Sequence, residues 1–321
     1  MEYIKSPLNY TGNKFRILSQ IQPFFPKSID TMVDLFCGGA TVGLNTECKK
    51  IIFVDKDKNV INLLRFLANS NFAALISDLE KLIKKYNLSY SAKNGYAYYK
   101  KLINDANANN GLKEFNKEGF YKLRSDYNTL KNKNNKTANE MLYLLMVYAF
   151  NNDMRFSNNG DFNLPVGKTD LNKSNINKLK NYIERVNNIR YDFICADFTS
   201  NRIQKIIKEA DFVYMDPPYL ITNAVYNESG KWKEQDEYEI LKFMNYCIDN
   251  NKKFVLSNVL EKQGKRNEPL YYWTTTMKDK IEIIDINYNY ISASYNKKNR
   301  NAKEREVIII PKKEDKNVKN K

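Results

Sequence analysis

Four consecutive residues, Asp216-Pro217-Pro218-Tyr219, place a carboxylate, two proline carbonyls and an aromatic ring in one short turn. They follow the apolar run 212–215, which the pattern predicts to be a short buried strand. Because neither proline has an N–H group to donate, the strand must end there. The carboxylate and the Pro217 carbonyl can accept both hydrogens of an exocyclic amine, while Tyr219 stacks on a flat heterocycle. The tetrapeptide alone also fits an ordinary turn at the end of a strand.

A second group of residues suits a nucleotide-like ligand. Residues 31–36 are predicted to form a strand, and residues 37–43, Cys-Gly-Gly-Ala-Thr-Val-Gly, lie between it and a helix. Glycines at that place let the backbone approach a ligand closely. A further predicted strand, residues 51–54, ends on Asp55, where α/β proteins bind ribose hydroxyls. A structural tight turn, and a helix N-cap supplied by Asp55 or Asp57, are the alternatives.

Composition narrows the classes of function. With 321 residues, of which 42% are hydrophobic, the chain has room for one large domain or two. Its 52 Lys and Arg residues against 37 Asp and Glu give a net charge of +15. That charge serves either solubility or a polyanionic partner, and 23 Tyr and 17 Phe favour nucleic acid over a membrane surface. The absence of histidine excludes His-based acid–base catalysis, Ser-His triads and imidazole metal ligands.

The cysteines and the apolar segments lead us to expect a soluble, cytoplasmic protein. The four cysteines lie far apart with no Cys-x-x-Cys pair, which predicts reduced thiols and neither a disulfide frame nor a zinc site. The first nine residues contain charges and a proline where a signal peptide would be apolar. The longest apolar run, residues 141–150, is too short to cross a bilayer.

The α/β pattern is interrupted between residues 62 and 172. Helical patterns there alternate with Asn- and Lys-rich stretches such as residues 131–136, which predicts an inserted helical domain. The polar segment 151–163 predicts a hairpin loop. Outside the insert we expect strands at 191–196, 212–215, 254–256, 281–290 and 307–310. We expect helices at 64–85, 120–130, 138–150, 200–209 and 237–249, a basic surface loop at 292–305 and a charged tail at 312–321.

Residues 5 to 310 together resemble the Dam-like N6-adenine DNA methyltransferases. The order of motifs carries the resemblance: Tyr10 and Lys14, the Asp34-Leu-Phe-Cys-Gly-Gly loop, the helical insert, Asp197 and the Asp-Pro-Pro-Tyr turn. Residues 120–128 and 160–167 also look like family sequence. The resemblance implies an α/β fold, a Rossmann-like methyltransferase sheet with an inserted helical target-recognition domain. Residues 1–61 and 173–311 would then be catalytic, and residues 62–172 would recognise the target.

The same resemblance implies S-adenosylmethionine as the methyl donor and requires no metal. It implies a catalytic role for Asp216, Pro217, Pro218 and Tyr219. Cofactor contacts would come from Tyr10, Lys14, Asp34, Phe36, Gly38, Gly39, Asp55, Asp197, Phe198 and Asp216. Asp55 matches the ribose ligand and Asp197 the contact to the cofactor's adenine. Tyr10 stands where the family often has Trp, and Gly12-Asn13-Lys14 replaces Gly-Gly-Lys, which affects the shape of the methionine pocket.

We therefore expect methyl transfer to N6 of an adenine that has been flipped out of a DNA duplex. Arginine reads guanine and asparagine reads adenine, so Arg155 and its neighbouring asparagines are candidate readers, and Phe156 is a candidate wedge. A solvated hairpin shaped by turn-forming asparagines is the alternative. The complete predicted DNA-binding set is Asn151, Asn152, Arg155, Phe156, Asn158, Lys297, Lys298 and Arg300. The target would contain guanine and adenine, with GATC the first candidate.

The expected partner is double-stranded DNA, bound by a monomer, with no membrane; DNA would associate the protein with the nucleoid. The sequence leaves open whether the protein is a solitary methylase or is paired with a restriction endonuclease. An RNA or rRNA base methyltransferase is one alternative, but it would be expected to lack the N-terminal segment and the insert of about 110 residues. A non-catalytic DNA-binding protein is another, but it would not need Asp55, Asp197 and Asp216 all in register.

Overall fold

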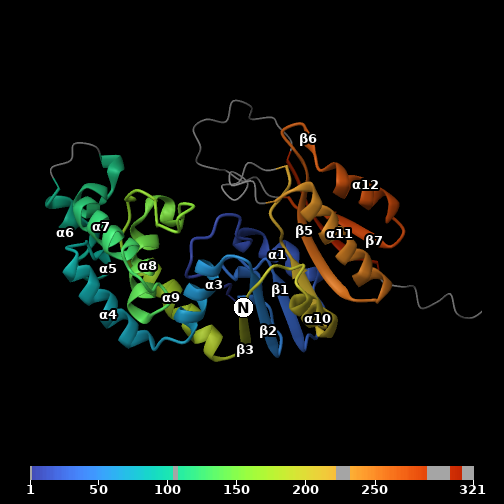
Figure 1. Cartoon of the computed structure of the whole chain (residues 1–321), viewed down its shortest axis with the longest axis horizontal. Coiled ribbons are helices and arrows are strands. Elements are labelled where there is room, and N and C mark those ends of the chain that lie inside the picture. Colours follow the sequence, from blue (N-terminus) through green and yellow to red (C-terminus); the bar gives the residue numbers. More distant parts are fainter. Residues whose placement is uncertain (1, 104–107, 222–231, 288–303, 313–321) are drawn as a thin grey trace, which may run out of the picture. The chain divides into compact units, whose positions relative to one another are not determined.

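A computed structural model describes residues 2–103, 108–221, 232–287 and 304–312 (Figure 1). The chain forms two compact units. Unit 1 comprises Met1–Phe15, Gly38–Asn45 and Asp57–Cys195, and unit 2 comprises Arg16–Cys37, Thr46–Lys56 and Ala196–Lys321. This division follows packing alone, so the assignment of residues 62–172 to target recognition stays a prediction.

Unit 2 is built on a mixed sheet in which the strand order is β2-β1-β4-β5-β8-β7, with β6 paired to β5. The strands are β1 (Thr31–Leu35), β2 (Lys50–Asp55), β4 (Phe212–Met215), β5 (Lys253–Lys262), β6 (Lys265–Arg266), β7 (Ile281–Asp285) and β8 (Glu304–Pro311). From β2 to β5 the pairs are parallel, whereas β8 is antiparallel to both β5 and β7. All of β4, and all of β1 after Thr31, is buried, as expected of strands covered on both faces.

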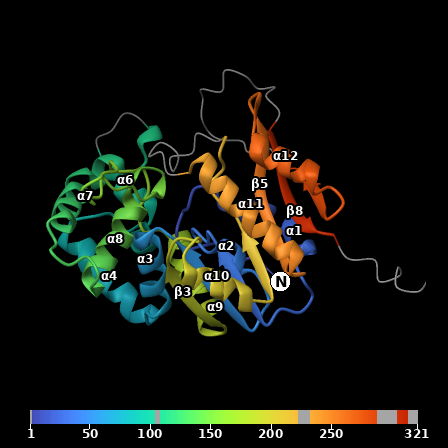
Figure 2. The same ribbon diagram turned by 45° about the vertical axis from the view of Figure 1, so that its right-hand side comes forward.

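Helices of differing length cover this sheet. They are α1 (Leu18–Ile21), α10 (Asn201–Glu209), α11 (Glu234–Asp249) and α12 (Glu268–Thr276), with 3-10 turns at Phe15–Ile17 and Gln22–Phe24. In α10 the buried residues are Ile203 and Ile207, four positions apart on one face. Helices α11 and α12 lie side by side in both views of the ribbon (Figures 1 and 2).

Unit 1 is mainly helical and is centred on α8 (Lys136–Tyr148), in which every residue from Ala138 to Tyr148 is buried. Packed against it are α3 (Lys58–Ala68), α4 (Phe72–Lys85) and α7 (Lys113–Asn128), and α9 (Lys173–Asn187) packs against α3 and α4. The smaller elements are α2 (Thr41–Leu44), α5 (Ser91–Asn94), α6 (Tyr96–Lys101), β3 (Arg190–Cys195), and 3-10 turns at Ala108–Asn110 and Phe150–Asn152.

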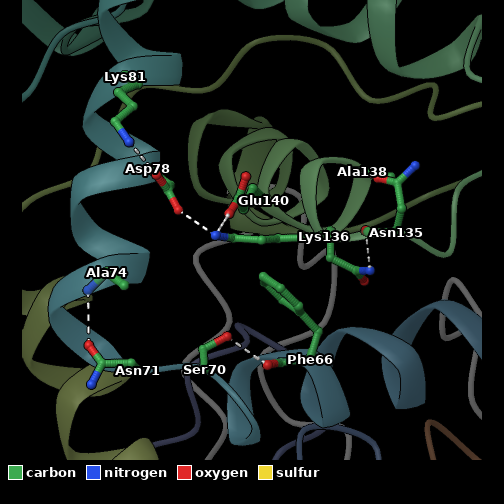
Figure 3. Close-up of polar contacts among 11 residues, drawn as sticks. Phe66, Ser70, Asn71, Ala74, Asp78, Lys81, Asn135, Lys136, Ala138 and Glu140 are labelled. Carbon is green, nitrogen blue, oxygen red and sulfur yellow. Dashed lines mark hydrogen bonds and ion pairs between the residues drawn. The ribbon is translucent and has the colours of Figure 1, made fainter.

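The single helix predicted over residues 64–85 is wrong, because the chain divides there into α3 and α4. The Asn71 side chain accepts a hydrogen bond from the Ala74 N–H at 3.0 Å and so begins a new helix (Figure 3). Ser70 Oγ donates to the Phe66 carbonyl, which lies in the last turn of α3. The apolar periodicity continues across the break, and only these polar side chains mark it.

Ion pairs join α4 to the start of α8. Lys136 Nζ lies 2.6 Å from Asp78 Oδ2, and Lys81 lies 2.6 Å from the other oxygen of the same carboxylate (Figure 3). Hydrogen bonds from Lys136 and Lys81 lower the pKa of Asp78 to about 2. Lys136 also lies 3.7 Å from Glu140, and burial raises the pKa of that carboxyl. The pairs on Asp78 are open to solvent, so they orient the two helices more than they stabilise them.

The other predicted elements agree with the structure to differing degrees. The strands predicted at 191–196, 212–215 and 254–256 are confirmed, and so are the helices at 200–209 and 237–249. Helices α9 and α12 were not predicted. Of the strand predicted at 281–290, β7 covers Ile281–Asp285, and residues 288–290 lie outside the described part. The basic loop predicted at 292–305 is outside it up to residue 303, while its last two residues begin β8.

Within the described residues, no helix is both long enough and apolar enough to span a membrane.

Glycine at position 119 allows α7 to pass against the end of α4. A Cβ atom added at Gly119 would lie 1.9 Å from the Tyr86 carbonyl oxygen and 3.2 Å from the Leu88 side chain. The nearest obstacle is backbone, which cannot rotate away, so the close approach of the two helices requires a residue with no side chain.

We predict that Gly119→Ala destabilises the protein, although glycine-to-alanine changes inside helices ordinarily stabilise by about 1 kcal/mol. The overpacking should lower the free energy of unfolding by about 1–3 kcal/mol. Denaturant unfolding monitored by circular dichroism measures the change, with Lys117→Ala on the exposed face of α7 as the control. A stabilised Gly119→Ala variant would contradict the packing described above.

Candidate functional site

The candidate site lies where the strand order of unit 2 reverses. β1 pairs with β2 on one side and β4 on the other, and the register sets Asp34 opposite Tyr214 and Leu35 opposite Met215. The Asp216 N–H donates to the Leu35 carbonyl at 3.3 Å, so the turns after β1 and β4 begin side by side. In open α/β sheets this position, at the carboxyl ends of the strands, is where ligands bind.

The turn after β1 has an unusual backbone. Phe36, Gly38 and Ala40 have φ angles of 65°, 46° and 63°, of which only the glycine adopts such values without strain. The Cys37 N–H donates to the Val54 carbonyl at 2.9 Å and fixes the turn against β2. Strained residues of this kind gather at ligand sites, so the conformation itself is a sign of function.

Three aromatic rings meet in a pocket beside this turn. Ring centroids of Phe36 and Phe198 lie 5.2 Å apart, and Trp232 lies 5.6 Å from Phe36 and 5.9 Å from Phe198. The complete lining is Leu35, Phe36, Val54, Asp55, Lys56, Asp197, Phe198, Trp232 and Asp236. The cavity is only about 10 Å³, so a flat ligand enters only when the rings move apart.

Two carboxylates of the predicted set lie in the same pocket. Asp55 is the last residue of β2, and its carbonyl accepts from the Ala196 N–H at 3.0 Å, which brings Asp197 beside it. Asp197 Oδ1 accepts from the Thr199 N–H at 2.9 Å and also shapes the turn. The helix-cap role that the sequence left open belongs to Asp57, whose Oδ1 accepts from the Asn59 N–H at 2.8 Å. Asp55 therefore does not cap that helix.

The pocket lining carries net negative charge, from Asp55, Asp197 and Asp236 against Lys56. Burial raises the pKa of the Cys37 thiol well above its usual value, and the charges of Asp55 and Asp34 raise it further. The thiol therefore stays protonated. Asp34 is 1% exposed, so its carboxylate acts through little water. A ligand with a positive charge is favoured there.

The Asp-Pro-Pro-Tyr turn brings its aromatic ring and its carboxylate together. The Tyr219 hydroxyl donates to Asp216 Oδ1 at 2.8 Å. Pro217 is buried, while the other three residues of the turn are half-buried. A substrate amine would share the carboxylate with Tyr219.

In unit 1 the N-terminal segment contacts the glycine turn. A Cβ atom at Gly38 would lie 2.5 Å from the Tyr10 ring, and one at Gly39 would lie 2.9 Å from Ser6 Oγ, so both glycines allow close contact with this segment. Lys14 is 3% exposed, and its Nζ donates to the Gly12 carbonyl at 3.0 Å. The structure thus brings Tyr10 to Gly38 and Gly39, while the cofactor contacts assigned to these residues stay a prediction.

The hairpin predicted at 151–163 is present in unit 1. Phe156 and Phe162 form an antiparallel bridge, and the Asn163 N–H donates to the Arg155 carbonyl at 3.0 Å. The exposed Arg155 side chain is oriented by its Nε, which donates to Asn163 Oδ1 at 2.8 Å. The Phe156 ring packs edge-on against Phe162 at 5.7 Å, which also gives it a structural role in the hairpin.

The asparagines of the hairpin differ in what they contact. The Asn152 amide donates to the Val147 carbonyl and to Thr169 Oγ1, and Asn151 accepts from Asn9 through its carbonyl. Asn158 is exposed at the tip. The remaining predicted DNA-binding residues, Lys297, Lys298 and Arg300, lie outside the described part of the chain.

Trp232 is a pocket residue that the sequence did not predict. Its Nε1 donates to Glu237 Oε2 at 2.7 Å, and the other oxygen of Glu237 accepts from Asn258 at 3.0 Å and Asn267 at 2.8 Å. Burial raises the pKa of Glu237, and the three N–H donors oppose that rise. No periodicity marks Trp232, because its place depends on Glu237 and on the partners of Glu237 from distant parts of the chain.

The sheet order and the pocket at the switch point define the α/β fold of S-adenosylmethionine-dependent methyltransferases. A model of the D12 class N6 adenine-specific DNA methyltransferases matches residues 10–291, and the chain belongs to this family. Within the described residues, no group of three or more His, Cys, Asp and Glu side chains is arranged to hold a metal ion.

Relatives of the chain are named modification methylases or type II methyltransferases. The chain is 32% identical to modification methylase StsI of Streptococcus sanguinis over 94% of its length. It is 33% identical to type II methyltransferase M.FokI of Planomicrobium okeanokoites over 96%, and 29% identical to modification methylase LlaI of Lactococcus lactis over 90%. The matches cover 42%, 43% and 44% of those relatives, so the chain spans less than half of their length.

We predict that Glu237→Leu removes the acceptor of three buried N–H groups and releases Trp232. Each buried donor left without an acceptor costs about 1–3 kcal/mol, so unfolding free energy should fall by at least about 2 kcal/mol. In a Trp273→Phe background Trp232 is the sole tryptophan, and its emission under tryptophan-selective excitation should shift to longer wavelength as water reaches it. Glu239→Gln, at a partly exposed position of α11, is the control; equal stability of the two variants would contradict the role given to Glu237.

Proposed function

We propose that the chain transfers a methyl group from S-adenosylmethionine to N6 of an adenine in a short DNA sequence. The observation that carries this proposal is the pairing of two sites at one switch point: the Asp216 turn and the acidic aromatic pocket beside it. Family membership supports the reaction class and favours DNA over RNA as the substrate. A target containing guanine and adenine follows from the hairpin residues, with GATC the first candidate.

The residues of the pocket fit the proposed cofactor. Phe36, Phe198 and Trp232 offer ring faces for its adenine, and Asp55 offers a carboxylate for its ribose hydroxyls. The cofactor carries a positive sulfonium, which the field from Asp34 and Asp55 favours. When bound it supplies an electrophilic methyl group. The roles of Tyr10, Lys14, Gly38 and Gly39 toward the same cofactor rest on the resemblance.

The Asp216 turn would act on the acceptor amine. The adenine amine is a poor nucleophile, because its lone pair is delocalised into the ring. Asp216 and the Pro217 carbonyl would accept its two hydrogens and so favour the pyramidal nitrogen that attacks. The base must leave the duplex at a cost of a few kcal/mol. Stacking on Tyr219 contributes about 1–3 kcal/mol in return.

The relatives' names bear on the setting of the reaction. Three of them are named modification methylases or a type II methyltransferase. We infer that this chain acts on double-stranded DNA in the cytoplasm, as part of a restriction–modification system or as a solitary methylase, and that a cognate endonuclease would act on the same site.

Asp216→Ala should abolish methyl transfer and leave cofactor binding measurable, because the lost carboxylate acts on the acceptor amine. Incubation with labelled S-adenosylmethionine and either duplex DNA or RNA measures methyl transfer. Calorimetry measures cofactor binding. Asp249→Ala, which removes an exposed carboxylate of α11, should keep the wild-type rate. If Asp216→Ala methylates DNA at more than a few per cent of the wild-type rate, the mechanism is wrong. If the wild-type protein methylates RNA but not DNA, the proposed substrate is wrong.

Arg155→Ala should relax specificity at one guanine and cost about 1–3 kcal/mol of affinity for the cognate site. Binding to unrelated DNA should barely change, because base contacts and not phosphate contacts are lost. Arg202→Ala, at an exposed position of α10, controls for the loss of one charge. Sequencing of the methylated positions compares the variants. An identical motif with identical stringency in all of them would exclude Arg155 as a reader.

A further inference from the structure

Unit 1 contains a second and larger cavity that the proposed function does not use. Its volume is about 410 Å³, and it lies between the start of α3, the end of α7 and the loop before α8. Pockets of this size take small ligands or parts of larger ones. Tyr127, which is 1% exposed, lies in its wall.

The lining is basic and rich in amides. Lys58, Lys131 and Lys133 contribute three positive charges, no aspartate or glutamate lines the cavity, and asparagines supply further N–H donors. The segment 131–136 was noted in the sequence only as an Asn- and Lys-rich stretch. The structure shows that its first four residues line the cavity.

The loop is held in a defined shape. The Asn134 N–H donates to Asn132 Oδ1 at 2.8 Å, and Asn62 of α3 donates to Asn134 Oδ1 at 3.3 Å. Lys133 lies over the Tyr127 ring with its Nζ 5.2 Å from the centroid. Because the loop is anchored on both α3 and α7, its backbone and the Lys133 side chain are held in place beside the cavity.

Lys58 occupies a position at which a lysine is unfavourable for the helix. It is the first residue of α3, where the helix dipole disfavours positive charge. The N–H groups of Asn59 and Val60 are already bonded to Asp57 Oδ1, so the lysines and amides, not the helix end, offer donors to a ligand. The exposed Lys58 ammonium can instead serve an anionic ligand in the cavity.

The cavity also lies next to the hairpin that carries Arg155. Lys133 Nζ donates to the Gly160 carbonyl at 3.2 Å and lies 3.7 Å from Asp161, at the hairpin tip. Asn128, the residue after Tyr127, exchanges hydrogen bonds with the backbone of Phe162 at 2.8 and 3.1 Å. The end of α7 therefore supports both the cavity and the hairpin.

We propose that this cavity binds one phosphodiester group of the DNA strand, outside the bases that are read. The inference rests on the proposed function, since it takes the hairpin to lie on DNA. Phosphate contacts fix the register of a protein on a duplex, whereas base contacts give specificity. A phosphate bound in this cavity would set where along the duplex the hairpin reads.

The test compares the salt dependence of DNA binding in wild type and Lys58→Gln/Lys131→Gln. In a plot of the logarithm of the binding constant against the logarithm of the salt concentration, loss of one phosphate contact should make the slope less steep by about 0.9. Removing Lys58 relieves an unfavourable helix position, so the variant should fold at least as well as wild type. Lys84→Gln/Lys180→Gln, which removes two exposed lysines of α4 and α9, controls for net charge and should keep the slope.

A methylphosphonate scan identifies the phosphate itself. Neutralising one backbone position outside the recognised bases should weaken wild-type binding and should have no further effect on the double variant. Inorganic phosphate titrated into the DNA-free protein tests the other source of this chemistry, and no saturable binding at millimolar phosphate is expected.

Three outcomes would overturn the proposal. The first is a salt dependence of DNA binding in Lys58→Gln/Lys131→Gln that equals that of wild type. The second is that the methylphosphonate and the two substitutions weaken binding additively at every backbone position. The third is tight binding of free phosphate to wild type that the substitutions abolish. Failure of the wild-type protein to bind or methylate duplex DNA would overturn the proposed function as well. Normal methylation with any of the first three results would overturn the phosphate site alone.

Discussion

The parallel pairing of β1 with β4 is the constraint on which the candidate site depends. Its register ends both strands at the same level, and the Asp216 N–H extends the ladder by one bond to the Leu35 carbonyl. A slip of one residue would turn every side chain of β4 to the opposite face. The buried apolar residues of these strands, which have no chemistry of their own, thus decide where the carboxylate stands.

The strained turn after β1 links that constraint to the aromatic pocket. A non-glycine residue with a positive φ, such as Phe36, costs about 1–3 kcal/mol unless its surroundings hold it. The bond from Cys37 to Val54 and the ring contacts of Phe36 with Phe198 and Trp232 do so. A purine that enters would replace ring–ring contacts with its own stacking. Opening the pocket therefore exchanges one set of apolar contacts for another.

The sequence predicts what backbone chemistry dictates and misses what depends on single side chains. The proline pair and the glycine turn located the switch point because they leave the chain few conformations. The break between α3 and α4 escaped prediction because the capping of Asn71 competes with an unbroken apolar period. Trp232 escaped because its place depends on a buried carboxylate, Glu237, whose partners come from β5 and from the residue before α12. Such long-range contacts leave no local pattern.

Asparagine shows why composition alone could not identify the DNA-reading residues. Helices α4, α8, α9 and α12 are each capped by an asparagine side chain, at Asn71, Asn135, Asn172 and Asn267. In the hairpin, Asn152 is likewise used by the fold, with its amide bonded to Val147 and Thr169. An amide that already holds the backbone cannot also form a bidentate bond to adenine. If the hairpin reads bases as proposed, it must do so through exposed groups, and among the described ones Arg155 is oriented by its bond to Asn163.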